Sequence, residues 1–168
     1  MSCVDKPSSA ASGPSSAASG LVVDDDCDMC RILELALASA GCTATTVGSA
    51  QDAIARFADY PFAVVFVDAR LPDMDCWRLI EKLRRRRPEV RIVMISGYYF
   101  EDDVRVARAL QASEIHGFLA KPFRIEAVLA MVAGLGGDGH RHPIRSGGDA
   151  RPAPKKLRCG PPRRFTYR

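Results

Sequence analysis

Four polar positions in this chain could do chemistry together. Three aspartates follow one another at 24–26, and Asp68, Ser96 and Lys121 come later in the sequence. Crowded carboxylates raise each other's pKa unless a cation lies among them, and aspartate oxygens without histidine or cysteine suit Mg²⁺. Aspartate can also accept a phosphoryl group covalently, and a lysine and a serine hydroxyl could contact that group. The sequence contains no P-loop, so direct use of ATP is not expected.

Each of these polar positions follows a short apolar segment. Residues 62–67 read FAVVFV and lead directly into Asp68, which predicts a buried strand over 63–67 with a carboxylate at its end. Residues 21–23, 92–95 and 116–120 precede the other polar positions in the same way. The polar side chains are therefore expected at the ends of strands.

Helical patterns separate these segments. Helices are predicted over 28–40, from the capping pair at 49 and 52 to Pro61, over about 75–87, over 101–111 and over 124–133. Ile32, Val104 and Ile125 are among the residues expected to face the core. A weaker strand is predicted at 43–47, where it would lie at an edge of the sheet.

Strand and helix thus alternate five times between residues 20 and 133. Such alternation with apolar central strands predicts an α/β protein whose parallel sheet is covered by helices on both faces. Right-handed crossovers and this length favour a flavodoxin-like (βα)5 doubly wound sheet with strand order 2-1-3-4-5. In that order the strands that end in polar residues are neighbours, and their carboxyl ends open on one crevice. Asp68 is therefore expected at the centre of a site.

The two ends of the chain differ in composition from its middle. Residues 8–13 and 15–20 repeat the hexamer SSAASG, which predicts a disordered leader over 1–19. Residues 20–133 hold 14 basic and 17 acidic side chains, whereas 134–168 hold 9 and 2 and are rich in Gly, Pro and Arg. The second segment is predicted to be a basic, disordered tail. The sequence shows no secretory signal and no apolar run of membrane-spanning length, so a cytoplasmic protein is expected.

Four motifs in order resemble one known family. VVDDD, VVFVDARLPDMD, VMISG and GFLAKPF are similar to the sequences at four strand ends in the receiver domain of two-component response regulators. The resemblance covers about residues 20–133. It implies that Asp68 is the phosphoacceptor and that Mg²⁺ is the cofactor. Asp25 would be a direct metal ligand, Asp24 would act through water, and the backbone carbonyl of Arg70 would be the third protein ligand.

The same resemblance implies how the signal passes on. Ser96 and Lys121 would contact the phosphoryl group, Phe118 would be the aromatic switch residue, and the bond from Lys121 to Pro122 would be cis. The phosphoryl donor would be a histidine kinase or a phosphotransfer protein. A downstream protein would bind the face formed by the fourth helix, fifth strand and fifth helix. The chain would be a phosphorelay module and not an enzyme, either stand-alone or part of a hybrid kinase.

Two other classes of function fit the sequence less well. A DNA-binding response regulator would use the basic segment 134–168. That segment has positive charge but no pattern of a folded DNA-binding domain, so nucleic acid is not the expected partner. A phosphatase with an aspartyl nucleophile would want a second aspartate where Arg70 stands.

Several other residues have a plain structural interpretation. Cys27 and Cys30 form a C-x-x-C without a second pair and are expected to be ordinary helix residues. The basic run 84–87 is expected to be solvated, and His116 to be structural. The aromatic run 98–100 could either cover the core or form a partner surface. Cys76 and Asp73 replace residues more usual in the family, which puts the geometry of their loop in question.

Overall fold

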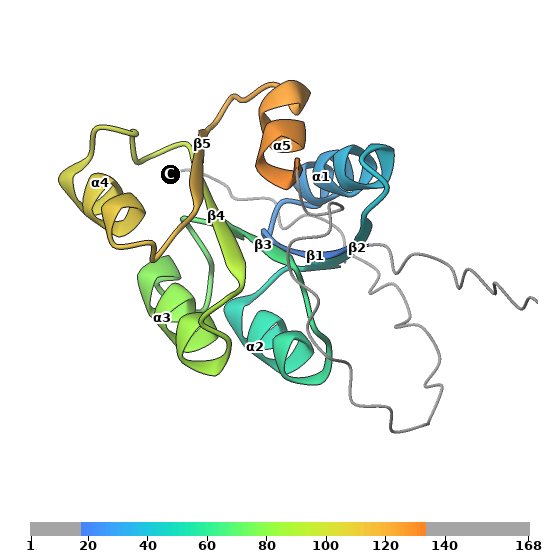
Figure 1. Cartoon of the computed structure of the whole chain (residues 1–168), viewed down its shortest axis with the longest axis horizontal. Helices are drawn as coiled ribbons and strands as arrows, with labels where there is room; N and C mark the ends of the chain where they lie inside the picture. Colours follow the sequence, from blue (N-terminus) through green and yellow to red (C-terminus); the bar gives the residue numbers. More distant parts are fainter. Residues whose placement is uncertain (1–17, 134–168) are drawn as a thin grey trace, which may run out of the picture.

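The computed structural model describes residues 18–133, in which five strands and five helices alternate (Figure 1). The strands are β1 (Ser19–Val23), β2 (Thr43–Val47), β3 (Val64–Asp68), β4 (Arg91–Ser96) and β5 (Gly117–Ala120). The helices are α1 (Cys27–Ser39), α2 (Ala50–Asp59), α3 (Cys76–Arg86), α4 (Val104–Gln111) and α5 (Ile125–Val132). All strand pairs are parallel in the order β2-β1-β3-β4-β5, which confirms the predicted flavodoxin-like α/β fold.

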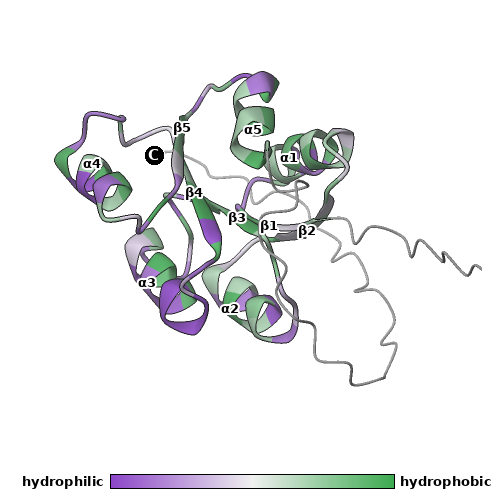
Figure 2. Cartoon of the chain, viewed as in Figure 1, coloured by the Kyte–Doolittle hydropathy of each residue, from purple (hydrophilic) through white to green (hydrophobic). Residues whose placement is uncertain are grey.

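The sheet separates two apolar cores. Helices α1 and α5 cover one face, and α2, α3 and α4 cover the other (Figure 1). Every residue of β3 is buried, because this strand pairs with β1 on one edge and β4 on the other. Figure 2 shows the same arrangement, with largely hydrophobic strands between two groups of helices that carry both hydrophobic and polar residues. Among the described helices, none is both long enough and apolar enough to cross a bilayer.

The first strand begins slightly earlier than the sequence indicated. Ser19 is already part of β1, and the carbonyl oxygen of Ala18 accepts a hydrogen bond from the amide of Thr43. Ser19 of the predicted leader therefore belongs to the sheet, and Ala18 is hydrogen-bonded to its edge. The rest of that leader, and the predicted basic tail, lie outside the described residues.

Acidic and hydroxyl side chains begin four of the helices. Asp26, Asp75 and Asp103 each accept backbone hydrogen bonds as N-caps of α1, α3 and α4, and Ser49 does so for α2. Asp103 caps α4 because residues 101–103 form a turn, so this helix is shorter than the predicted span 101–111. At the other end of α1, Gly41 has a φ of 74°, a conformation in which a side chain would be strained.

The predicted inward faces of three helices were partly wrong. Ile32 is 41% exposed, Val104 is 66% exposed and Ile125 is 42% exposed. The buried residues of α1 are Cys30, Leu33, Ala36 and Leu37, and those of α4 are Val106 and Ala109. The apolar residues of these helices span more than one stripe, so spacing alone does not settle which stripe faces inward.

The basic run at the end of α3 is not a uniformly solvated face. Arg84 reaches the connection between α4 and β5, where its side chain donates hydrogen bonds to the carbonyl oxygens of Ser113 and Glu114. Its guanidinium also contacts Nδ1 of His116, and this positive charge, after burial, helps to lower the pKa of His116. Arg87 donates to the carbonyl of Tyr60 at 2.5 Å. Two of the four arginines therefore join separate parts of the fold.

Replacing Arg84 with alanine should lower the free energy of unfolding by about 1.5–3 kcal/mol, because the charged donor to several backbone carbonyls is lost. Arg85 is the matched control. Its guanidinium makes an exposed ion pair with Glu81 at 2.6 Å, and Arg85→Ala should cost at most about 0.5 kcal/mol. Chemical denaturation of both variants measures the difference, and equal losses would contradict the role given to Arg84.

Candidate functional site

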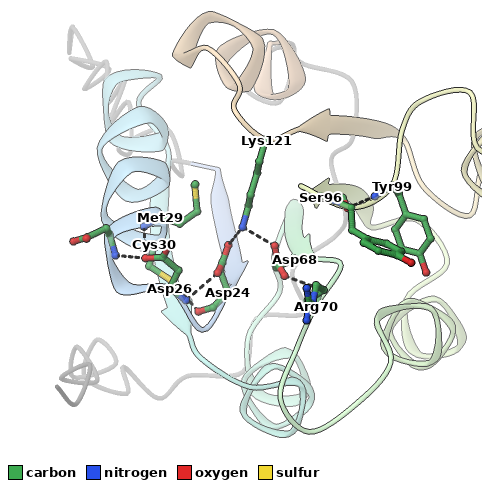
Figure 3. Close-up of polar contacts among 11 residues, drawn as sticks. Asp24, Asp26, Met29, Cys30, Asp68, Arg70, Ser96, Tyr99 and Lys121 are labelled. Carbon is green, nitrogen blue, oxygen red and sulfur yellow. Dashed lines mark hydrogen bonds and ion pairs between the residues drawn. The ribbon is translucent and has the colours of Figure 1, made fainter. Parts of the chain in front are cut away.

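Three charged side chains meet at the carboxyl ends of β1, β3 and β5 (Figure 3). The ammonium group of Lys121 lies 2.6 Å from Oδ1 of Asp68 and 2.9 Å from Oδ2 of Asp24. Both carboxylates are buried, with Asp24 2% exposed and Asp68 6% exposed. One lysine thus bridges two aspartates that lie 44 positions apart in the sequence.

The Asp24 carboxyl is the more deeply buried of the two. Its Oδ1 accepts a hydrogen bond from the amide of Asp26 at 2.9 Å, and its other oxygen pairs with Lys121. Burial raises the pKa of the Asp24 carboxyl, and the hydrogen bonds from Lys121 and the Asp26 amide offset only part of this effect. Asp26 itself caps α1 and points away from the bridge (Figure 3).

Both oxygens of Asp68 have partners. Oδ1 pairs with Lys121, and Oδ2 accepts a hydrogen bond from the amide of Arg70 at 2.6 Å. Arg70 in turn forms an isolated antiparallel bridge with Asp75, the residue that caps α3. The chain therefore turns back on itself directly after Asp68 and brings the backbone of Arg70 close to the carboxylate.

The acidic side chains form a group that could hold a metal ion. Asp24, Asp25 and Asp68 each offer a carboxylate oxygen, and these oxygens all lie within 4.8 Å of one another. Two of the donors are buried and Asp25 is exposed, so the group opens to solvent and leaves room for water ligands. Oxygen donors with water beside them fit a hard divalent cation. The residues present are thus compatible with such an ion.

Lys121 is held in place from its backbone. Its amide donates to the carbonyl of Ser96 at 2.6 Å, which fastens the end of β5 to the end of β4. The bond to Pro122 is cis, as the family resemblance implied. Burial lowers the pKa of the Lys121 ammonium, but its contacts with Asp68 and Asp24 outweigh burial and raise the pKa above its usual value. The lysine therefore stays charged at neutral pH.

Ser96 lies beside this group but its hydroxyl is engaged elsewhere. The side chain is buried, and its Oγ accepts hydrogen bonds from the amides of Tyr98 and Tyr99 at 2.9 and 2.8 Å (Figure 3). The hydroxyl thus supports the loop after β4. Phe118, the other predicted switch residue, lies on β5 and is half-buried against the core.

The aromatic residues 98–100 do not all have the same role, since one covers the core and two are exposed. The Tyr99 ring packs edge-on against Trp77 of α3, at 6.2 Å between ring centroids. Tyr98 and Phe100 are 68% and 69% exposed. The guanidinium of Arg105 lies 4.5 Å above the Trp77 ring on its α4 side. One aromatic of the run therefore covers the core, and the other two are available to a partner.

Two residues that depart from the resembled family are accommodated locally. Cys76 is fully buried at the start of α3, and burial raises the pKa of its thiol to about 12. Asp73 accepts hydrogen bonds from the amides of Ala50 and Gln51, both at 2.9 Å. No pattern in the sequence indicates the contact of Asp73, because its partners lie more than twenty positions away.

Comparison with known proteins places the same region in one family. The family described as the response regulator receiver domain matches residues 21–133. The DNA-binding transcriptional regulator NtrC of Salmonella typhimurium is 32% identical over 111 residues, which cover 66% of this chain and 23% of that protein. The probable transcriptional regulatory protein TcrX of Mycobacterium tuberculosis is 30% identical over 115 residues, covering 68% and 48%.

Solved structures agree with the fold. A CheY-like receiver domain from Methanospirillum hungatei superposes with a TM-score of 0.63 at 23% identity, covering 70% of this chain and 91% of that one. The chain spans about a quarter of the length of NtrC and about half of that of TcrX.

Proposed function

We propose, from the premise that this chain belongs to the response regulator receiver domain family of two-component systems, that it accepts a phosphoryl group on Asp68. The observation that carries the proposal is the position of Lys121 between Asp68 and Asp24. A carboxylate at the end of a buried strand, beside a fixed cation and a second acidic group, is suited to carrying a phosphoryl group. The lysine can donate a hydrogen bond to one oxygen of the phosphoryl group and offset the negative charge of that group.

We assign the metal site to the acidic group and take the ion to be Mg²⁺. Asp25, which is exposed, would be the direct ligand together with Asp68, and Asp24 would act through water because Lys121 already occupies one of its oxygens. The backbone carbonyl of Arg70 would be the third protein ligand, which the turn after Asp68 supports. When bound, the ion offsets the negative charge of the incoming phosphoryl oxygens.

For the phosphoryl transfer itself, the protein mainly has to position the reacting groups. One carboxylate oxygen of Asp68 attacks the phosphorus of a donor phosphohistidine, an acyl phosphate bond forms, and the bond from phosphorus to the imidazole nitrogen breaks. The imidazole leaves with that electron pair and keeps the proton on its other nitrogen. Lys121 stays protonated and moves its hydrogen bond from the carboxylate to a phosphoryl oxygen.

Phosphorylation would then change the loop after β4. For the Ser96 hydroxyl to contact the phosphoryl group, it must turn from the amides of Tyr98 and Tyr99. We propose that this movement, with Phe118, shifts a pre-existing equilibrium and changes the α4–β5–α5 face. Exposed Tyr98 and Phe100 beside α4 support a protein partner at this face, since aromatic side chains are frequent in the centres of interfaces.

The remaining assignments follow the family. The donor would be a histidine kinase or a phosphotransfer protein, the domain would catalyse only its own phosphorylation, and the protein would act in the cytoplasm.

We propose that residues 134–168 are an accessory tail. The similarity to regulators whose names describe DNA binding keeps a DNA-binding response regulator as the alternative, although the match covers their receiver portion only.

Incubation with phosphoramidate and Mg²⁺ tests the proposal. The intact mass should rise by one phosphoryl group, the group should be released by hydroxylamine as expected of an acyl phosphate, and a chelator should prevent the reaction. Asp25→Ala should slow phosphorylation by about tenfold or more, since it removes the direct ligand. A phosphoryl group that resists hydroxylamine, or labelling that needs no divalent ion, would refute the assignment.

A further inference from the structure

A side chain in the loop between Asp68 and α3 hydrogen-bonds to the start of another helix. Asp73 lies in this loop, and its two carboxylate oxygens accept hydrogen bonds from the amides of Ala50 and Gln51, each at 2.9 Å. These amides are the first two of α2, where the helix dipole also favours a negative charge. The contact joins residues 22 and 23 positions apart.

The helix has its own cap without Asp73. The hydroxyl of Ser49 accepts from the amide of Asp52 at 3.1 Å, and the amide of Ala53 donates to the carbonyl of Ser49. Asp52 also supplies an acidic side chain in the first turn. The start of α2 therefore has a local cap without Asp73. What the Asp73 contact adds is to hold the loop that carries Asp73 against this helix.

The residues just before α2 lie against the backbone of Asp24 and Asp25. A Cβ on Gly48, two residues before α2, would lie 4.0 Å from the carbonyl oxygen of Asp24 and from Cα of Asp25. The amide of Asp24 donates to the carbonyl of Val47 at 3.1 Å. The segment 47–51 thus contacts the chain carrying Asp24 and Asp25 on one side, and the chain carrying Asp73 on the other.

We propose that Asp73 is a positioning residue for the metal site, because it holds the loop that carries Arg70 at a fixed place relative to Asp24 and Asp25. This inference rests on the proposed function, in which the Arg70 carbonyl and the Asp25 carboxylate bind the same ion. Without the Asp73 contact, the loop would adopt its ligand geometry only part of the time. The apparent affinity for the ion equals the intrinsic affinity multiplied by the fraction of molecules in the competent geometry, so it falls as that fraction falls.

The test is the Mg²⁺ affinity of the full chain by isothermal titration calorimetry. Asp73→Ala should weaken binding about tenfold, and Asp73→Asn, which keeps one acceptor oxygen, should lie between this variant and the wild type. Ser49→Ala is the matched control for the helix, because it removes the other cap of α2 without touching the loop. Asp52→Asn is the control for charge, since it removes one negative charge from the same helix start.

Both controls should keep Mg²⁺ affinity within about twofold of the wild type, although chemical denaturation should show Ser49→Ala to be destabilised as much as Asp73→Ala. Unchanged affinity in the folded Asp73 variants would overturn the inference and leave the proposed function standing. Equal weakening by Ser49→Ala or by Asp52→Asn would also overturn it, since helix stability or charge would then be the cause. A wild-type chain that binds no Mg²⁺ would overturn both proposals.

Discussion

Replacing Asp68 with asparagine should abolish phosphorylation, with no phosphoryl group detectable by intact mass under conditions that label the wild type fully. An amide oxygen is a poor nucleophile, and the acyl phosphate cannot form on it. Folding should not suffer. Asparagine keeps an acceptor for the Arg70 amide or for Lys121, and Lys121 still pairs with Asp24. The variant should therefore lose phosphorylation but keep its folded structure.

Asp26→Asn is the matched control for this experiment. It makes the same change of charge beside the acidic group, but Asp26 caps α1 and asparagine is an equally good cap. Its phosphorylation should stay within about twofold of the wild type, since no group assigned to the transfer is altered. Labelling that persists in Asp68→Asn, or that disappears equally in Asp26→Asn, would contradict the assignment of the phosphoacceptor.

Replacing Lys121 with methionine should lower the free energy of unfolding by about 2–3 kcal/mol in the absence of Mg²⁺. The side chains of Asp24 and Asp68 are only 1% and 8% exposed, and the lysine is the cation between them. Removing one partner of a buried pair costs about 3–5 kcal/mol, and the partial exposure of Lys121 reduces that figure. Phosphorylation should fall by about 10²-fold or more, because the donor to the phosphoryl oxygens is lost.

Two further measurements identify the cause of this destabilisation. Adding Mg²⁺ should restore part of the lost stability, because the ion supplies positive charge to the same carboxylates. Asp24→Asn in the Lys121→Met background should restore part as well, since it removes one of the two repelling charges. Lys82→Met, on the exposed side of α3, should change stability by less than about 0.5 kcal/mol. Lack of recovery in both measurements would show that lost packing is responsible.

The sequence predicted the fold and the position of Asp68 because both depend on local patterns. The apolar run before Asp68 predicts a buried strand, and the strand order places that strand between β1 and β4, with β5 next to β4. The residues that it failed to predict act across long separations. Arg84 binds a connection about thirty positions away and Asp73 binds a helix start 23 positions away. No spacing rule connects such partners before the chain is folded.

The contact between Tyr99 and Trp77 makes the protein observable without a label. Trp77 is the one tryptophan of the sequence, it is 6% exposed, and within the described residues its Nε1 has no hydrogen-bond partner. Its ring touches Tyr99, whose amide is bonded to the hydroxyl of Ser96. The tryptophan fluorescence of this chain therefore comes from a single indole, which contacts the residue bonded to the Ser96 hydroxyl, in surroundings where a shift of the loop alters both quenching and polarity.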